Sequence, residues 1–303
     1  MPDLAILYEH PRWFLPLFAA LDSRGVSYAA IDVADHRFDP AARDVPAPVV
    51  FNRVAMSSFL RGEDHPIFYA ASLLARWQEL GARVVNGPSA LAYDTSKARQ
   101  VALLADLGVA VPRTLAVHRA ANVPAAAQAI GYPVLVKANI GGSGANIARF
   151  DDAATLAAAV ADGTLPQSID RVLLVQDYVP ARGGITTRVE TLGGRFLYAI
   201  DVSNSGGSFD LCLADICAAP GAPSMTAAAP PAAIVSAVER VATAMALDVG
   251  GVEYMVDDRD GVARVYDINA LSNFVADPLP LLGYDPHERL VDYLVAVIAE
   301  QRS

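Results

Sequence analysis

Side chains suited to catalysis are concentrated in the stretch 250–274, where acidic and amide residues interrupt two apolar, β-branched runs. The runs flank a polar turn that ends in a glycine, which is typical of a β-hairpin. We expect residues 259–261 to form a three-residue loop with Gly261 in the left-handed conformation. The strands then leave the loop with Asp258 facing Val262, and this pair sets the register of the hairpin.

Counting outward in this register places Glu253 directly opposite Asp267, with Asn269 on the same face two residues further on. Two carboxylates and one amide are hard oxygen ligands, which suit a Mg²⁺ ion that also binds substrate phosphates. The alternative is an ordinary hairpin with a polar, solvated outer face. The hairpin therefore predicts a candidate metal site that needs support from elsewhere in the chain.

A second candidate site combines a lysine with a glycine-rich loop. Lys137 ends an apolar strand pattern, and Gly142, Ser143 and Gly144 follow it. Backbone N–H groups of such a loop can approach an anion, and the lysine adds a positive charge. The loop lacks the Gly-Lys-Ser/Thr of a Walker loop, and it does not open a helix after the first strand as a dinucleotide-binding loop does. The sequence thus predicts either a phosphate-binding loop or a flexible hairpin tip.

The elements that would position these groups begin with residues 1–92, where strand and helix patterns alternate. Alternation of this kind predicts a parallel sheet with helices on its faces, and ligands bind beyond the carboxyl ends of such strands. Arg53 follows one strand and is a candidate clamp for a substrate carboxylate; alternatively, it caps a helix or pairs with Asp44. His10 follows another strand, as a substrate contact or as an ordinary turn residue.

A Pro/Gly-rich break at residues 180–184 indicates a hinge between two further units, 93–180 and 181–303. A helix begins near Lys97 in the first unit. In the second, Arg188 lies inside a strand pattern, where a charged side chain needs a partner or a functional role. The buried strand pattern before the break ends in polar residues, Gln176, Asp177 and Tyr178, followed by Val179.

Composition excludes several classes of protein. The 303 residues are 53% hydrophobic and 18% charged, which fits a compact globular chain, and the net charge of −10 disfavours nucleic-acid binding. No apolar run approaches a membrane-spanning length, and we expect a cytoplasmic protein. Cys212 and Cys217 have no Cys-x-x-Cys spacing or nearby His, so we expect reduced thiols. The Gly/Pro/Ala-rich stretch 203–231 is a lid, a binding loop or disordered.

In this order and spacing, the motifs resemble those of the ATP-grasp superfamily and, within it, the RimK-like carboxylate–amine ligases. The resemblance covers nearly the whole chain. It implies an α/β N-terminal pre-ATP-grasp domain with a parallel sheet (1–92), followed by a two-subdomain α+β ATP-grasp fold: a small lid (93–180) and a C-terminal subdomain with the metal site (181–303). The matching motifs are Asp94–Lys97, Pro133–Lys137 with its glycine loop, Val175–Val179, Arg188–Gly194, Gly251–Glu253, Asp267–Asn269 and Val50–Arg53.

The resemblance implies ATP and Mg²⁺, or Mn²⁺ in its place. It implies a substrate carboxylate that is phosphorylated to an acyl phosphate, and an amine that then attacks it. Arg188 would neutralise the transferring phosphoryl group. The other implied contacts are Lys97, Lys137 and Gly142–Gly144 to the phosphates; Gln176–Val179 to the adenine; Glu253, Asp267 and Asn269 to the metal; and Arg53, His10 and Asn273 to the substrate.

The chain departs from the family pattern at three places, of which the first concerns ribose recognition. Residues 182–184, Arg-Gly-Gly, stand where many relatives have an acidic ribose contact; Asn269 is not followed by the usual Pro-Gly; and the stretch 203–215 lacks basic residues. Glutamate or ribosomal-protein substrates are therefore not carried over. Retention of Lys137 and Asp267 favours an enzyme over a non-catalytic nucleotide-binding regulator. An ATP-grasp phosphotransferase that acts on a non-carboxylate substrate is an alternative that no sequence feature excludes. Small-molecule or peptide substrates and a homo-oligomer are compatible with the resemblance.

Overall fold

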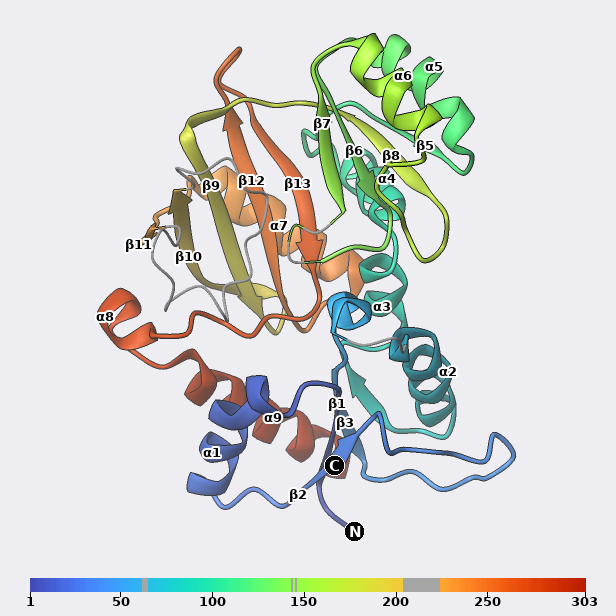
Figure 1. The fold of residues 1–303 in the computed structure, drawn as a ribbon. Coiled ribbons are helices and arrows are strands. Elements are labelled where there is room, and N and C mark those ends of the chain that lie inside the picture. Colours follow the sequence, from blue (N-terminus) through green and yellow to red (C-terminus); the bar gives the residue numbers. More distant parts are fainter. Residues whose placement is uncertain (62–64, 143, 145, 204–223) are drawn as a thin grey trace.

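The computed structural model describes residues 1–61, 65–142, 144, 146–203 and 224–303. Three β-sheets follow one another along the chain and enclose a central region between them (Figure 1). Within the described residues, no helix is long and apolar enough to cross a membrane. The sheets are built from the apolar runs that the sequence singles out, so the predicted mixture of α/β and α+β architecture is confirmed.

The first sheet is parallel, with strand order β2-β1-β3-β4, as the alternation of strands and helices predicts. Its strands are short apolar runs; β1 and β3 are almost wholly buried. The elements are β1 (Leu4–Tyr8), η1 (Pro11–Phe14), α1 (Leu15–Ser23), β2 (Tyr28–Asp32), β3 (Val49–Arg53), η2 (Met56–Leu60), α2 (Pro66–Glu79), β4 (Arg83–Val85) and α3 (Pro88–Asp94). The sequence did not predict α3.

The second sheet is antiparallel, with order β5-β8-β6-β7, and two helices pack on it. A side-chain cap from Ser96 starts the helix that carries Lys97, because its oxygen accepts from the Arg99 backbone N–H. The elements are α4 (Lys97–Asp106), β5 (Thr114–Val117), η3 (Ala120–Asn122), α5 (Val123–Ile130), β6 (Val134–Ala138), β7 (Ile147–Phe150), α6 (Ala153–Ala161) and β8 (Leu173–Asp177).

The third sheet has order β11-β10-β9-β12-β13 and is antiparallel throughout. The last helix leaves it and packs in one core with α1 and the first sheet, so both chain ends lie together (Figure 1). The elements are β9 (Ala181–Leu192), β10 (Arg195–Ser203), β11 (Ser224–Ala227), α7 (Ala232–Met245), β12 (Val249–Asp257), β13 (Ala263–Asn269), α8 (Pro278–Leu282) and α9 (Pro286–Arg302).

The β12–β13 hairpin differs from its predicted register at the tip. Gly261 is left-handed as expected, with φ of 76°, but Val256 pairs with Ala263, so the predicted pairing of Asp258 with Val262 is wrong. The turn is one residue longer than expected, because the Asp257 backbone N–H donates to the Val262 carbonyl at 2.9 Å. An irregularity further along the ladder removes this offset before the site is reached.

Candidate functional site

A cavity of about 560 Å³ lies where the three sheets meet. This volume is typical of sites for small ligands. Residues from every sheet contribute to its wall, including Trp13 and Ser57 from the first, Lys137 and Gln176 from the second, and Glu253 from the third. Twelve of the predicted nucleotide, catalytic and metal residues line it: Lys97, Lys137, Gly142, Gly144, Gln176, Asp177, Tyr178, Val179, Arg188, Glu253, Asp267 and Asn269.

The three predicted metal-site residues come together on one face of the hairpin. Glu253 pairs with Asp267 in the ladder, as predicted. The Asn269 side-chain amide donates to Glu253 Oε1 at 3.2 Å, and the Tyr266 hydroxyl donates to Glu253 Oε2 at 2.8 Å. Lys97 Nζ forms an ion pair with Asp267 from the facing helix. Residues separated by more than 150 positions in the sequence thus meet at one point.

A β-bulge at Tyr266 produces this arrangement. The ladder pairs Tyr254 with Val265 but Glu253 with Asp267, so Tyr266 is the extra residue. A bulge re-aims the side chains beside it, and both Tyr266 and Asp267 line the cavity although they are consecutive. The bulge therefore restores the register that the longer turn displaces, and it adds a tyrosine hydroxyl beside the carboxylate pair.

The donor set fits a small divalent cation. Among the described residues, no group of three His, Cys, Asp or Glu side chains could hold a metal by itself. Two carboxylates and an amide nevertheless suit Mg²⁺, which takes its remaining ligands from water and phosphate oxygens. Burial raises the pKa of Glu253, and Arg188 opposes that effect. A cation beside Glu253 would likewise favour the charged carboxylate.

Arg188 reaches the same carboxylates from strand β9. Its Nε donates to Glu190 Oε1 at 2.6 Å and its Nη1 to Glu253 Oε1 at 3.1 Å. Burial lowers the pKa of Arg188, but Glu190 and Glu253 outweigh that effect and the pKa is raised above its usual value. The guanidinium lies against Gly251, where an added Cβ would stand 2.6 Å from Nε. The glycine therefore makes room for a permanently charged arginine at the cavity.

Lys137 faces the hairpin from the second sheet. Its side chain is 4% exposed, and its Nζ donates to the Tyr266 carbonyl at 3.4 Å. Burial, reinforced by Lys97, lowers the pKa of Lys137 to about 8. The glycine-rich loop follows on the same strand end, and Ser143 in that loop lies outside the described residues. Two ammonium groups thus face one cavity, a suitable arrangement for a polyanion.

The glycine loop also touches the N-terminal sheet. A Cβ on Gly142 would stand 2.7 Å from the Ser57 Cβ and 3.2 Å from the Ser57 backbone N, so the two segments are in direct contact. Ser57 belongs to η2, which follows strand β3, and its hydroxyl accepts from Arg61 Nη1 at 3.1 Å. Only a residue without a side chain permits this approach. The loop is therefore positioned partly by the first sheet.

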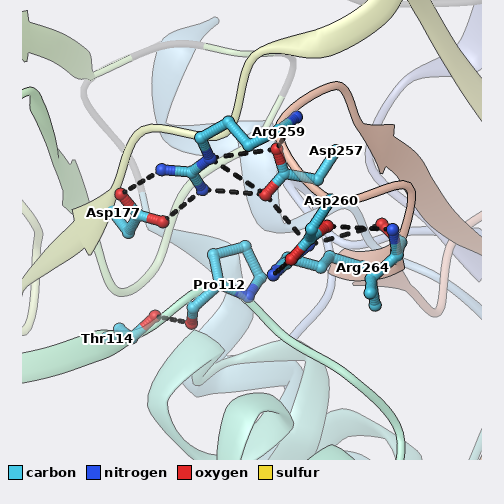
Figure 2. Close-up of polar contacts among 8 residues, drawn as sticks. Pro112, Thr114, Asp177, Asp257, Arg259, Asp260 and Arg264 are labelled. Atoms are coloured by element: carbon cyan, nitrogen blue, oxygen red, sulfur yellow. Dashed lines mark hydrogen bonds and ion pairs between the residues drawn. The ribbon is translucent and has the colours of Figure 1, made fainter.

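The segment from Gln176 to Val179 lies at the end of β8, beside the crossover to the third sheet. Gln176 is buried and donates to Thr114 Oγ1 at 2.8 Å. The Tyr178 ring lies under the Arg149 guanidinium, 4.0 Å away. Val179 is also buried. The Asp177 carboxylate binds a guanidinium from the hairpin tip, that of Arg259 (Figure 2).

The three predicted substrate residues occupy different places. Asn273 lines the cavity, whereas Arg53 and His10 are not part of its wall. Arg53 is 2% exposed; its Nη2 donates to Asn273 Oδ1 at 3.0 Å, and its guanidinium lies over two phenylalanine rings. His10 caps η1 and stacks on Trp13. Arg53 and His10 thus adjoin the cavity only through contacts to Asn273 and Trp13, which line it, and their substrate roles stay predictions.

Sequence reasoning missed several cavity residues, chief among them Asp94. Its Oδ1 accepts from the Ala270 backbone N–H at 3.0 Å, and burial raises its pKa to about 6. Asp94 stands in the same four-residue motif as Lys97, so its position was the available signal. Trp13, Met56 and Ser57 also line the cavity, and nothing in their residue types distinguishes them from core or turn residues.

Comparison with known proteins agrees with this geometry. The model of the carbamoyl-phosphate synthase L chain, ATP binding domain family matches residues 94–273. A probable alpha-L-glutamate ligase from Teredinibacter turnerae is 27% identical over 143 residues, which are 47% of this chain and 46% of that protein. The chain thus matches about half the length of this curated relative.

Two solved structures show the same fold. The ATP-grasp ligase PsnB, solved with a phosphomimetic variant of its minimal precursor, Mg and ADP, has a TM-score of 0.70 at 19% identity, covering 98% of this chain and 100% of the other. The RimK domain protein ATP-grasp from Sphaerobacter thermophilus has a TM-score of 0.69 at 20% identity, covering 97% and 99%. The predicted resemblance to RimK-like ATP-grasp proteins is confirmed. With the family model spanning more than half of its residues, this chain has the ATP-grasp fold and belongs to the carbamoyl-phosphate synthase L chain, ATP binding domain family.

Proposed function

We propose that the protein is an ATP-dependent carboxylate–amine ligase that forms an amide or peptide-type bond. One observation carries the proposal: two lysines, one arginine and an oxygen-rich carboxylate–amide trio converge on a single cavity bordered by a glycine loop. Phosphoryl transfer depends on positioning and charge neutralisation more than on a protein nucleophile, and this cavity supplies both.

The proposed reaction has two steps, phosphoryl transfer to the carboxylate and attack of the amine on the acyl phosphate. In the first, a substrate carboxylate oxygen attacks the γ-phosphorus of ATP, the bond to the bridging oxygen breaks and ADP leaves. In the second, an amine nitrogen attacks the acyl carbon of the resulting acyl phosphate, the bond to phosphate breaks, and the amine gives up a proton. Lys97 and Lys137 bind the phosphates, and Arg188 stabilises the negative charge of the transferring group.

Glu253, Asp267 and Asn269 would hold Mg²⁺, or Mn²⁺ with the same oxygen ligands. When bound, the ion neutralises phosphate charge and fixes the orientation of the triphosphate. Lys97 forms an ion pair with Asp267, and Arg188 and Tyr266 donate hydrogen bonds to Glu253. These side chains hold the oxygen ligands close together, so the site is pre-organised for a cation.

The N-terminal wall of the cavity would take the carboxylate substrate. Trp13, Ala55, Met56 and Phe274 make this wall largely apolar, with Asn273 and Ser57 as its polar groups. Small molecules and peptides are both candidate substrates, and the ATP-grasp ligase PsnB has been solved in complex with a precursor peptide. Asn273, held by Arg53, is the residue best placed to hydrogen-bond the substrate.

Turnover with hydroxylamine as a surrogate amine tests this function. The protein is incubated with Mg-ATP and a panel of amino acids, other carboxylic acids and short peptides. Formation of ADP and a hydroxamate in equal amounts supports an acyl-phosphate ligase and identifies the carboxylate. AMP and pyrophosphate would instead indicate adenylation and contradict the mechanism. Phosphorylation of a hydroxyl group without hydroxamate would favour the phosphotransferase alternative.

A further inference from the structure

The tip of the β12–β13 hairpin contacts the end of strand β8 through one arginine. Arg259 lies between the carboxylates of Asp257, in its own hairpin, and Asp177, in the second sheet (Figure 2). Its Nη1 donates to Asp177 Oδ1 at 3.2 Å and its Nη2 donates to Asp177 Oδ2 at 2.6 Å. This is a two-pronged guanidinium–carboxylate pair, the geometry that fixes orientation as well as distance.

The hairpin side of this contact is rigidly anchored. The Asp257 side chain is fully buried and accepts from the Arg259 backbone N–H at 2.9 Å and from its Nε at 3.0 Å. Arg264 binds the same carboxylate at 2.9 Å. The bonds from Arg259 are the main reason that the pKa of Asp257 is lowered. Contacts within its own turn thus fix the position of the Arg259 side chain, which also binds Asp177 in the second sheet.

The other side of the contact is the start of the crossover between the two sheets. Asp177 is the last residue of β8, and its backbone N–H donates to the Arg113 carbonyl at 2.8 Å. Three residues later, the Pro180 carbonyl accepts from the Asp258 backbone N–H at 2.9 Å. The hairpin tip is therefore attached to both ends of residues 177–180, which overlap the segment Gln176–Val179 that is expected to contact the adenine.

The same hairpin carries Glu253 and Asp267 at its other end. A bound nucleotide must reach from the 177–180 segment to these carboxylates, so the separation of the two sites has to match the length of the molecule. We propose that Arg259 is a positioning residue that sets this separation by joining Asp177 to the hairpin. The inference rests on the nucleotide placement of the proposed function and extends it to a residue outside the cavity wall.

The expected signature is a loss of nucleotide affinity with little loss of stability. The side chains of Arg259 and Asp177 are 46% and 24% exposed, and ion pairs of this kind contribute little to global stability. Their loss would let the 177–180 segment occupy other orientations. Apparent affinity falls in proportion to the population of the binding-competent orientation. Nucleotide affinity should therefore decrease even though the free energy of unfolding hardly changes.

The experiment measures binding of a non-hydrolysable ATP analogue with Mg²⁺ by calorimetry, without turnover. Arg259→Gln and Asp177→Asn should each raise Kd by roughly five- to tenfold, and the double variant should add little, because both changes break one pair. Arg259→Lys keeps the positive charge but cannot form the two parallel hydrogen bonds of a guanidinium, so its Kd should lie between those of wild type and Arg259→Gln. For Arg259→Gln and Arg259→Lys, turnover at saturating ATP should change by less than about twofold.

Arg264→Gln is the matched control. Arg264 lies in the same hairpin tip, but its ion pairs within the described residues are to Asp257 and Asp260, in its own hairpin, and not to Asp177. Its Kd should equal that of wild type. An Arg264→Gln effect as large as that of Arg259→Gln, or an unchanged Kd in Arg259→Gln, would overturn the inference alone. Failure of the wild-type protein to bind the analogue would instead contradict the proposed function.

Discussion

The two walls of the cavity use their cations in opposite ways. On the nucleotide wall, Lys97, Lys137 and Arg188 reach the cavity surface although each is largely buried. Beside the N-terminal wall, two arginines lie outside the cavity lining and pack against aromatic rings: Arg53 over Phe14 and Phe51, and Arg61 over Trp13. Both of these arginines also have protein partners, Asn273 and Glu9.

This difference in the placement of cations fits the different tasks of the two walls, which are to neutralise a triphosphate and to hold a substrate. Neutralising a triphosphate requires several exposed charges, whatever the acceptor is. Holding a substrate requires shape, and Trp13, Met56 and Phe274 present an apolar surface to the cavity. A charged cavity wall and an apolar one should therefore respond to substitution in different kinetic parameters, and the following predictions test that distinction.

The largest effect is expected for Asp267→Ala on the nucleotide wall. This change removes one of the two carboxylates proposed to hold the metal, together with the ion pair to Lys97. We expect kcat to fall by about 10³-fold or more, because a bound cation contributes several kcal/mol to charge stabilisation. Circular dichroism and thermal unfolding should show a retained fold. Activity close to wild type at saturating Mg²⁺ would refute the metal assignment.

Gly251→Ala tests whether Arg188 must keep its position. The new Cβ would stand 2.6 Å from Arg188 Nε and 2.9 Å from its Cζ, so the guanidinium has to move. A displacement of this size can lower kcat by up to about 100-fold. The KM for ATP should change far less, since the lysines are untouched. Equal losses in kcat and ATP affinity would place Arg188 in ground-state binding instead.

The pH dependence of nucleotide binding tests Lys137. Its pKa is lowered to about 8 by burial and by Lys97, so its charge is present below that value and lost above it. Binding of an ATP analogue should therefore weaken by about tenfold between about pH 7 and about pH 9. In Lys137→Arg, whose side chain stays charged, the decline should disappear. If binding to Lys137→Arg declines by the same factor over this pH range, the decline arises from the titration of another group.

The smallest kinetic effect is expected for Arg53→Ala on the N-terminal wall. Removing the guanidinium releases Asn273 and leaves the Ser272 carbonyl without a donor, at a cost of about 1–3 kcal/mol in the free energy of unfolding. The KM for the carboxylate should rise several-fold, more than the KM for ATP. A rise confined to the ATP KM would place Arg53 on the nucleotide wall and erase the contrast between the walls.

Local sequence pattern predicted most of the strands and the residues that meet in the cavity. Apolar periodicity decides which segments become strands, and hard-oxygen side chains at the strand ends mark the site. The pairing of Glu253 with Asp267 was predicted correctly, although two errors cancelled in it: a turn that is longer than expected and a bulge that was not foreseen. Bulges depend on packing around the strand and leave no signal in the alternation of residues.

Contacts between segments that are far apart in the chain could not be predicted from the sequence. The return of α9 to the first sheet follows from apolar packing between segments at opposite ends of the chain. The bridge from Arg259 to Asp177 joins two residues that each have a plausible local role, in a turn and at a strand end. Arg53 sits behind rings instead of at the surface because Phe14 and Phe51 flank it, and strand periodicity does not show which side chains will cover a charge.

The bulge at Tyr266 has a consequence for how this hairpin tolerates insertions and deletions. Fourteen positions separate Glu253 from Asp267 here, a spacing that contains one extra residue in the turn and one in the strand. A homologous chain without either irregularity would hold the same two carboxylates face to face with a shorter spacing. Gaps in this hairpin should therefore occur in compensated pairs, and a motif of fixed length would overlook chains whose carboxylates occupy the same positions in space.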